Sequence, residues 1–227
     1  MKIEYTTIFG FAAALRGMRN PQDSWAKSDT TFDYMHGIEP TIYGFRIPES
    51  PAIGPVDLAL MCKLTKAGGD HRKFLRYIDV TADLTIPRAI WQELDTYKVA
   101  TVRNSCSTMN KLSARDLTPE DFENNDVDPA TLRYLNQLGE VHRTKGEYQD
   151  AAGTRYSGNK LLEHMKYRLP EGFLQKATYK FNYENALKMY LSRKDHRMSC
   201  WSGQAGLCTW IHTWPYMAQL IGTMLGL

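Results

Sequence analysis

Residues 67–111 read AGGDHRKFLRYIDVTADLTIPRAIWQELDTYKVATVRNSCSTMNK, and this stretch decides the fold that the sequence predicts. Tyr77–Leu84 alternates apolar and polar residues, which indicates a strand with one buried face. Pro87 follows where the first turn of a helix tolerates it, and the helix is predicted over Ile86–Lys98. A polar loop, Thr101–Thr108, comes next. Ionisable side chains on both sides of that loop suit a site for an anionic ligand.

The rest of the chain predicts further helices and two strands around this stretch. Strands are predicted at Met1–Phe11 and Phe173–Phe181. Helices are predicted at Ala12–Arg19, Val56–Ala67, Thr131–Val141, Leu161–Arg168 and Tyr183–Arg197, with a last helix over Cys200–Ile221 broken near Trp214. Loops are predicted at Lys145–Gly158 and before residue 55, the latter with the aromatic anchors Trp25, Phe32, Tyr34, Tyr43 and Phe45. With no linker and no repeat, the sequence predicts a single α+β domain over residues 1–227.

Composition excludes some classes of function. The chain has 227 residues, with 28 basic and 25 acidic side chains and a formal charge of +3. This balance is too even for nucleic-acid binding by bulk electrostatics. Glu4 interrupts any secretory signal early, and no stretch approaches the roughly 20 apolar residues of a membrane helix. The cysteines form no CxxC pair and the histidines show no zinc spacing, so we expect reduced thiols in the cytoplasm and no metal.

The loop 101–108 and its flanks form the first candidate site. Its hydroxyls and amides, with Asp70, His71 and Lys98 nearby in sequence, can cradle a phosphate or contact a base edge. The alternative is an ordinary polar turn that caps a helix. Cys106 would need a cation such as Arg103 to lower the pKa of its thiol before it could act as a nucleophile, and we expect it to be a small polar loop residue.

Two clusters of charged residues form the other candidates. Glu184 and Lys188 lie four residues apart after Asn182, which is typical of a surface ion pair on a helix. Arg193 either complements the end of that helix or contacts a ligand. Near the N-terminus, Arg16 and Arg19 suit a two-pronged grip on phosphate, with salt bridges to Asp23 or Asp29 as the alternative.

Two ungapped stretches, Gly69–Thr108 and Lys166–Asp195, resemble the flavin-dependent thymidylate synthase family over about a third of the chain. Matching positions are the segment containing His71, the helix entry at Pro87, the pair Leu169-Pro170, then Asn182 and Arg193. The family's Arg-His-Arg triplet is here Thr96-Tyr97-Lys98. Lys166 and Glu184 each replace an Arg, Lys188 replaces an Asn, Cys106 a Ser, and Thr108 a phosphate-binding Arg.

The resemblance implies a single domain of that family's fold, with mixed helices around a small antiparallel sheet. It implies an enzyme that uses FAD as cofactor and methylates dUMP with methylenetetrahydrofolate and NADPH. Its partners would be a pyrimidine nucleotide and further copies of the chain in a homotetramer, without nucleic acid or membrane. The alternative is a nucleotide-binding protein of the same fold that has lost flavin chemistry.

The resemblance also implies the site residues. No side chain serves as a catalytic nucleophile or metal ligand. The implied cofactor-binding residues are His71, Thr96, Tyr97, Lys98, Asn182, Glu184 and Lys188. The implied substrate-binding residues are Asn104, Ser105, Cys106, Ser107, Lys166 and Arg193.

Overall fold

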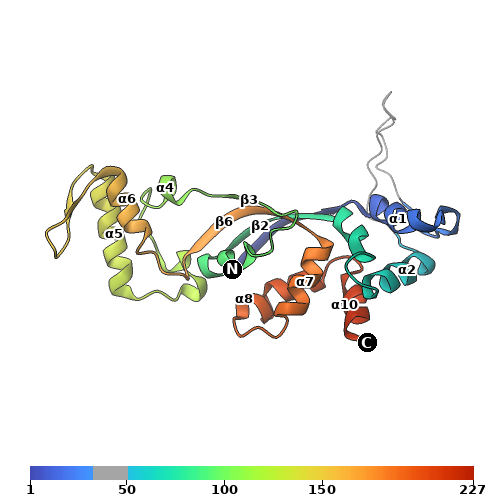
Figure 1. Ribbon diagram of the computed structural model, residues 1–227. Coiled ribbons are helices and arrows are strands. Elements are labelled where there is room, and N and C mark those ends of the chain that lie inside the picture. Colours follow the sequence, from blue (N-terminus) through green and yellow to red (C-terminus); the bar gives the residue numbers. More distant parts are fainter. Residues whose placement is uncertain (33–50) are drawn as a thin grey trace, which may run out of the picture. The chain divides into compact units, whose positions relative to one another are not determined.

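The computed structural model describes residues 1–32 and 51–227, so the predicted anchors Tyr34, Tyr43 and Phe45 lie outside the described residues (Figure 1). The strands are β1 (Lys2–Phe9), β2 (Asp79–Pro87), β3 (Val102–Ser105), β4 (Tyr148–Gln149), β5 (Arg155–Tyr156) and β6 (Leu174–Asn182). The α-helices are α1 (Phe11–Arg19), α2 (Pro55–Lys66), α3 (Arg88–Leu94), α4 (Thr108–Lys111), α5 (Pro129–Arg143), α6 (Gly158–Lys166), α7 (Tyr183–Arg193), α8 (Ser199–Ser202), α9 (Leu207–His212) and α10 (Met217–Leu225). Short 3-10 helices include η3 (Arg72–Tyr77) and η4 (Pro119–Asp121).

Four strands form the main sheet in the order β1-β2-β6-β3. Two backbone hydrogen bonds fix the direction of its central pair: Tyr183 N donates to Ile78 O at 3.0 Å, and Arg88 N donates to Phe173 O at 3.1 Å. Moving forward along β2 therefore means moving back along β6, so the two strands are antiparallel. In β2 the residues from Val80 to Ile86 alternate between buried and half-buried, which confirms the predicted buried face.

The described residues divide into two compact units. Unit 1 comprises residues 1–5, 82–98 and 102–179, and unit 2 comprises residues 6–81, 99–101 and 180–227. Three of the five boundaries fall inside strands β1, β2 and β6, and the other two flank residues 99–101 between α3 and β3. The prediction of one domain over residues 1–227 stays a prediction.

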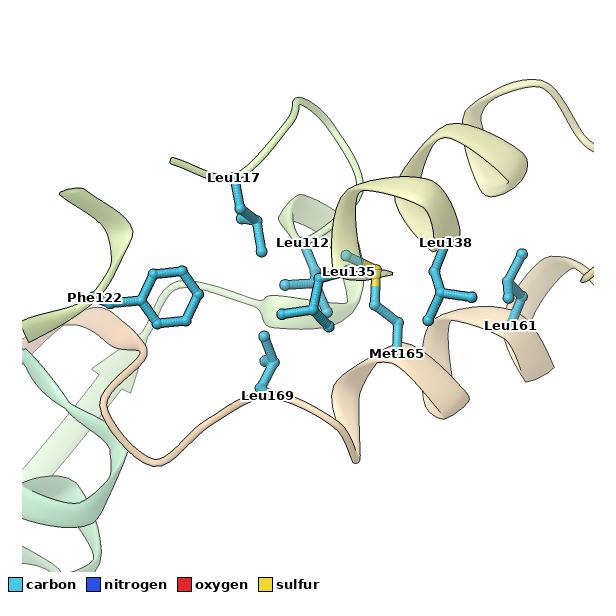
Figure 2. Close-up of a cluster of buried hydrophobic side chains, with 8 residues drawn as sticks. All are labelled: Leu112, Leu117, Phe122, Leu135, Leu138, Leu161, Met165 and Leu169. Atoms are coloured by element: carbon cyan, nitrogen blue, oxygen red, sulfur yellow. The ribbon is translucent and has the colours of Figure 1, made fainter. Parts of the chain in front are cut away.

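Apolar side chains from α5 and α6 form much of the core of unit 1. Figure 2 shows Leu135 and Leu138 of α5 facing Leu161 and Met165 of α6. The remaining members of this cluster are Leu112, Leu117, Phe122 and Leu169. Helix α5 begins as the sequence dictates, because Asp128 accepts a hydrogen bond from Thr131 N at 2.7 Å and leaves one fewer unpaired N–H in the first turn.

The segment Lys145–Gly158 forms a hairpin, which corrects the prediction of a loop. Strands β4 and β5 are antiparallel, with Tyr148 opposite Tyr156. Asp150 Oδ1 accepts hydrogen bonds from the backbone N–H groups of Ala152 and Thr154, at 3.0 and 2.8 Å, and these bonds shape the turn. The hairpin is very short, so its sequence lacks the run of alternation that reveals longer strands.

A buried ion pair ties α1 to α2 in unit 2. Arg19 Nε donates to Asp57 Oδ1 at 2.6 Å, and both side chains are buried. Asp57 Oδ2 also accepts from Ser28 and Thr30, at 2.6 and 2.5 Å. The partner of Arg19 is therefore Asp57, and not Asp23 or Asp29 as the sequence analysis offered. These contacts hold the segment before residue 31 against the two helices.

Gly10 marks the sharp turn between β1 and α1. Its φ is +102°, and a Cβ atom built there would lie 1.9 Å from Tyr77 O. Only glycine satisfies both the left-handed backbone and this close approach. The predicted strand-to-helix transition near residue 10 is thus confirmed.

Four other predicted segments differ from the structure. Helix α3 spans Arg88–Leu94 and not Ile86–Lys98, because Ile86 and Pro87 still belong to β2. In the turn after the helix, Thr96 Oγ1 donates to Glu93 O at 2.7 Å. The predicted loop 101–108 contains strand β3, extended by a bond from Cys106 N to Lys176 O at 2.8 Å. Helix α7 ends at Arg193 and not Arg197. The last predicted helix is divided into α8, α9 and α10, and the expected break near Trp214 is confirmed.

Candidate functional site

A buried carboxylate at the start of α7 gathers three cationic side chains in unit 2. Asn182 caps the helix by accepting a hydrogen bond from Asn185 N at 3.0 Å, which places Glu184 in the first turn. Glu184 is 1% exposed. Its Oε2 accepts a hydrogen bond from Arg76 Nε, and its Oε1 lies 3.2 Å from Lys188 Nζ. Arg72 Nε lies 3.5 Å from the same Oε1.

Glu184 is ionised at neutral pH. Burial alone would raise the pKa of this carboxyl, but the hydrogen bonds and charges of Arg76 and Lys188 outweigh that cost and lower it. The same ion pair raises the pKa of Arg76. Glu184 and Lys188 are thus more than the surface pair that their spacing predicts, because the carboxylate is enclosed and shared.

A cavity of about 850 Å³ lies beside this cluster in unit 2. Arg76, His71, Lys73 and Asp70 line it together with apolar side chains, which are Met18, Leu60, Leu64, Phe74 and Tyr77. Its volume is in the range of sites for small molecules and cofactors, about 300–1,000 Å³. The predicted cofactor residue His71 therefore lies at a cavity of suitable size.

The other predicted residues of unit 2 lie in different surroundings. Asn182 is 0% exposed, and its Nδ2 has no hydrogen-bond partner among the described residues. The Arg193 guanidinium lies 5.1 Å from the centre of the Trp201 ring, a cation–π arrangement. Neither residue lines the cavity near His71.

The predicted loop residues lie in unit 1, on and after β3. Asn104 and Ser105 belong to the strand and are exposed. Cys106 and Ser107 follow it and line a cavity of about 590 Å³ that also includes Lys111. Gln175 Nε2 donates to Cys106 O at 3.0 Å and fixes this end of the strand.

Lys166 lines a third cavity, of about 230 Å³, beside Arg88 and Arg103 in unit 1. Arg103 is fixed there on three sides. Its guanidinium stacks 4.0 Å from the centre of the Trp91 ring and donates to Asp95 at 2.8 Å and to Gln175 at 2.9 Å. Arg103 therefore has a structural role in this cavity.

The triplet Thr96-Tyr97-Lys98 lies in the turn after α3. Tyr97 N donates to Leu94 O at 3.0 Å, and Lys98 ends the segment 82–98 of unit 1. The predicted site residues are thus distributed over both units, and each unit brings only some of them together.

Within the described residues, no group of three or more His, Cys, Asp or Glu side chains could hold a metal ion. No helix in the described ranges 1–32 and 51–227 is long and apolar enough to cross a membrane.

Arg72 and Arg76 were not among the predicted site residues, because the segment before β2 carries no helical pattern in the sequence. Both residues lie on η3, four positions apart. The signal that could have identified them is the acidic residue at position 184. A carboxylate buried in the first turn of a helix requires cationic or hydrogen-bonding partners from elsewhere in the chain.

Two solved structures share the fold over nearly the whole chain. Thymidylate synthase X (ThyX) from Helicobacter pylori, in a structure with FAD and dUMP, matches with a TM-score of 0.65 and 13% identity, covering 99% of this chain and 99% of that chain. The chain has the ThyX fold. A second structure, the flavin-dependent thymidylate synthase ThyX from Helicobacter pylori complexed with FAD and dUMP, matches with a TM-score of 0.63 and 14% identity over 97% of each chain.

The likeness to ThyX confirms the predicted α+β fold. No family model matches the sequence, and no curated protein matches it either. The ThyX fold is therefore present in a sequence that is only 13% and 14% identical to the two solved structures.

Proposed function

We propose that this chain is a divergent FAD-dependent thymidylate synthase-like enzyme that methylates dUMP, with methylenetetrahydrofolate as carbon donor and NADPH as reductant. The observation that carries this proposal is the match over 99% of both chains to a ThyX structure that holds FAD and dUMP. The cavity at His71 supports it with a site of suitable volume. A cytoplasmic homotetramer is part of the same proposal, and it rests on the sequence resemblance.

The residues present fit the phosphate groups of FAD and fit its ring system less well. His71, Lys73 and Arg76 offer hydrogen-bond donors at the 850 Å³ cavity. By contrast, Asn182 and Glu184 are enclosed by protein, with 0% and 1% of their surface exposed. These two side chains do not fit direct contact with a flavin, although the resemblance places them there.

For the nucleotide substrate, we propose contacts from the predicted residues of unit 1. Lys166 is half-buried at the 230 Å³ cavity, and Cys106 and Ser107 line the 590 Å³ cavity. Hydroxyl and ammonium groups of this kind bind phosphate and base edges. Arg193 is proposed as a further nucleotide contact on the strength of the resemblance.

The test is retention of FAD followed by turnover. The purified protein is incubated with FAD, freed of unbound ligand, and its absorption spectrum is recorded. A retained flavin band, and dTMP formed only when dUMP, methylenetetrahydrofolate and NADPH are all present, would support the enzyme. A folded protein that binds no FAD at tens of micromolar would contradict it.

A second candidate is a nucleotide-binding protein of the same fold without flavin chemistry. The enclosure of Asn182 and Glu184 favours it, because neither side chain is available to contact a flavin. This candidate predicts that dUMP raises the melting temperature while FAD leaves it unchanged. Equal shifts from both ligands would refute it.

A further inference from the structure

The charges around Glu184 do not balance. One buried carboxylate faces three cations, so the cluster of Glu184, Arg72, Arg76 and Lys188 carries a surplus of two positive charges. Arg72 is 17% exposed and also contacts Met224, so it lies on the inner side of the cluster. Arg76 and Lys188 are 48% and 47% exposed. The surplus charge is therefore accessible to a ligand.

Arg76 has the geometry of an anion-binding residue. Its Nε is bound to Glu184, which restrains the guanidinium. Among the described residues, no hydrogen bond from its two Nη groups is found, and the side chain lines the 850 Å³ cavity. A guanidinium held at one edge presents its other donors in a fixed fork, the arrangement that binds phosphate through two parallel hydrogen bonds.

The neighbouring side chains add to this preference. Lys73 contributes a second permanent positive charge to the cavity lining, and His71 contributes a ring with a donor and an acceptor. Asp70 subtracts one charge. Arg76 and Lys73 together outweigh Asp70, so the lining carries a net positive charge, while its apolar wall suits a ring or a carbon chain attached to the phosphate.

We propose that Arg76, with Lys73 and His71, binds the phosphate or diphosphate group of a ligand in this cavity. The identification of that ligand as FAD rests on the proposed function. The resemblance expects an Arg at position 184, where this chain has Glu184. Arg76 on η3 supplies a positive charge instead, and its hydrogen bond to Glu184 holds the guanidinium in place. The site is one for a phosphorylated organic ligand, with the phosphate at Arg76.

The experiment measures binding of inorganic pyrophosphate and of FAD to the full chain by calorimetry, at low salt. Arg76→Ala is compared with Arg76→Lys and with Lys63→Ala, an exposed cation on α2 that does not line the cavity. Arg76→Ala should weaken pyrophosphate binding about 10- to 100-fold, the equivalent of losing charge-assisted hydrogen bonds. Arg76→Lys should recover part of the loss, and Lys63→Ala should bind as the parent does.

Two results would overturn the proposal. One is a parent protein that binds neither pyrophosphate nor FAD, and the other is an Arg76→Ala variant that is folded and binds both as the parent does. The fate of the enzyme assignment is separable. Pyrophosphate binding that depends on Arg76, without FAD retention, would support the anion site and count against the enzyme. If the Arg76→Ala variant retains FAD as the parent does, the result would support the enzyme and count against the anion site.

Discussion

Glu184 stabilises unit 2 only while it is charged. Its folded-state pKa is lowered, so its contribution is fully present above the unfolded-state pKa of about 4.3 and is lost as the pH falls through the lower folded value. Glu184→Gln should cost about 1–3 kcal/mol at pH 7, less than a fully buried pair because Arg76 and Lys188 are half-exposed.

Urea denaturation at pH 7 and pH 3.5 measures both effects. The difference between Glu184→Gln and the parent should shrink at the lower pH. The matched control is Glu163→Gln on the exposed face of α6, expected to change stability by less than about 0.5 kcal/mol. A Glu184→Gln variant as stable as the parent at pH 7 would contradict this account.

His164 is a second titratable residue whose pKa is shifted in the folded protein, and the shift is downward. Burial, and then the charge of Arg168, lower the pKa of its imidazole, while Asp150 opposes the shift. Its ring lies 3.9 Å from that of Tyr156 on the hairpin, and Tyr134 Oη lies 3.1 Å from its Nε2. His164 takes up a proton near pH 6.5 in the unfolded chain but only at lower pH in the folded chain. The free energy of unfolding should therefore fall as the pH drops below about 6.5.

Thermal denaturation between pH 7.5 and pH 5.5 tests this. The melting temperature of the parent should fall more steeply than that of His164→Gln, which cannot titrate. His142→Gln is a control, as a half-buried histidine on α5 that is bound to Ser113. Parallel pH profiles for the parent and His164→Gln would exclude the assigned role.

At the scale of elements, α5 and α6 depend on each other through their leucines. Leu138 is 0% exposed in the cluster of Figure 2. Leu138→Ala should destabilise the protein by about 2–5 kcal/mol, through lost transfer free energy and the cavity left behind. Leu225→Ala near the end of α10 is the control, because that side chain is 42% exposed. Equal urea midpoints for the two variants would show that α5 and α6 do not form a core.

The sequence predicted long, regular elements well and short ones poorly. Strand β2 was recognised from its alternation, and α5 was predicted at Thr131–Val141, two residues short of its observed bounds Pro129–Arg143 at each end. The hairpin β4–β5 and strand β3 were not, because two to four residues carry too little pattern to be distinguished from a loop. Their strand character comes from tertiary hydrogen bonds such as Cys106 N to Lys176 O.

Candidate sites were predicted less well than elements for the same reason. Arg76 and Glu184 are 108 residues apart in sequence, and no local sequence pattern at either position predicts their contact. Arg19 and Asp57, 38 residues apart, present the same difficulty. Local spacing correctly predicted the contact between Glu184 and Lys188 but not the distant partner Arg76, and for Arg19 it predicted nearby partners where the structure has Asp57.

For the whole molecule, ligand binding should appear as added stability. At a free FAD concentration of about 100 times its Kd, a protein that binds FAD only when folded gains about 2.7 kcal/mol. Under the proposed function, the melting temperature should therefore rise with FAD concentration, and dUMP should raise it further. Differential scanning fluorimetry over a FAD series measures this, with riboflavin, which lacks the phosphates, as control. A melting temperature independent of FAD would count against the enzyme.

The division into two units was beyond sequence prediction because it leaves no trace in composition. Three of its boundaries run through strands and the other two flank residues 99–101, and no shift to Gly, Pro or Ser occurs at any of them. The overall class was within reach, since the arrangement of strand, helix and polar loop at residues 77–108 resembles one family, and the fold of that family is the one observed.

The antiparallel pairing of β2 with β6 sets the order of events during synthesis. Asp83 on β2 bonds to Thr178 on β6, 95 residues later. A ribosome adds that many residues in about 5–20 s, and during this time the backbone groups along one edge of β2 have no strand β6 to pair with. Such distant pairing also slows refolding from denaturant, because the entropy cost of closing a long loop comes before any stabilising contact forms. The nascent chain should therefore be a client for chaperones that shield exposed strands until residue 182 has emerged.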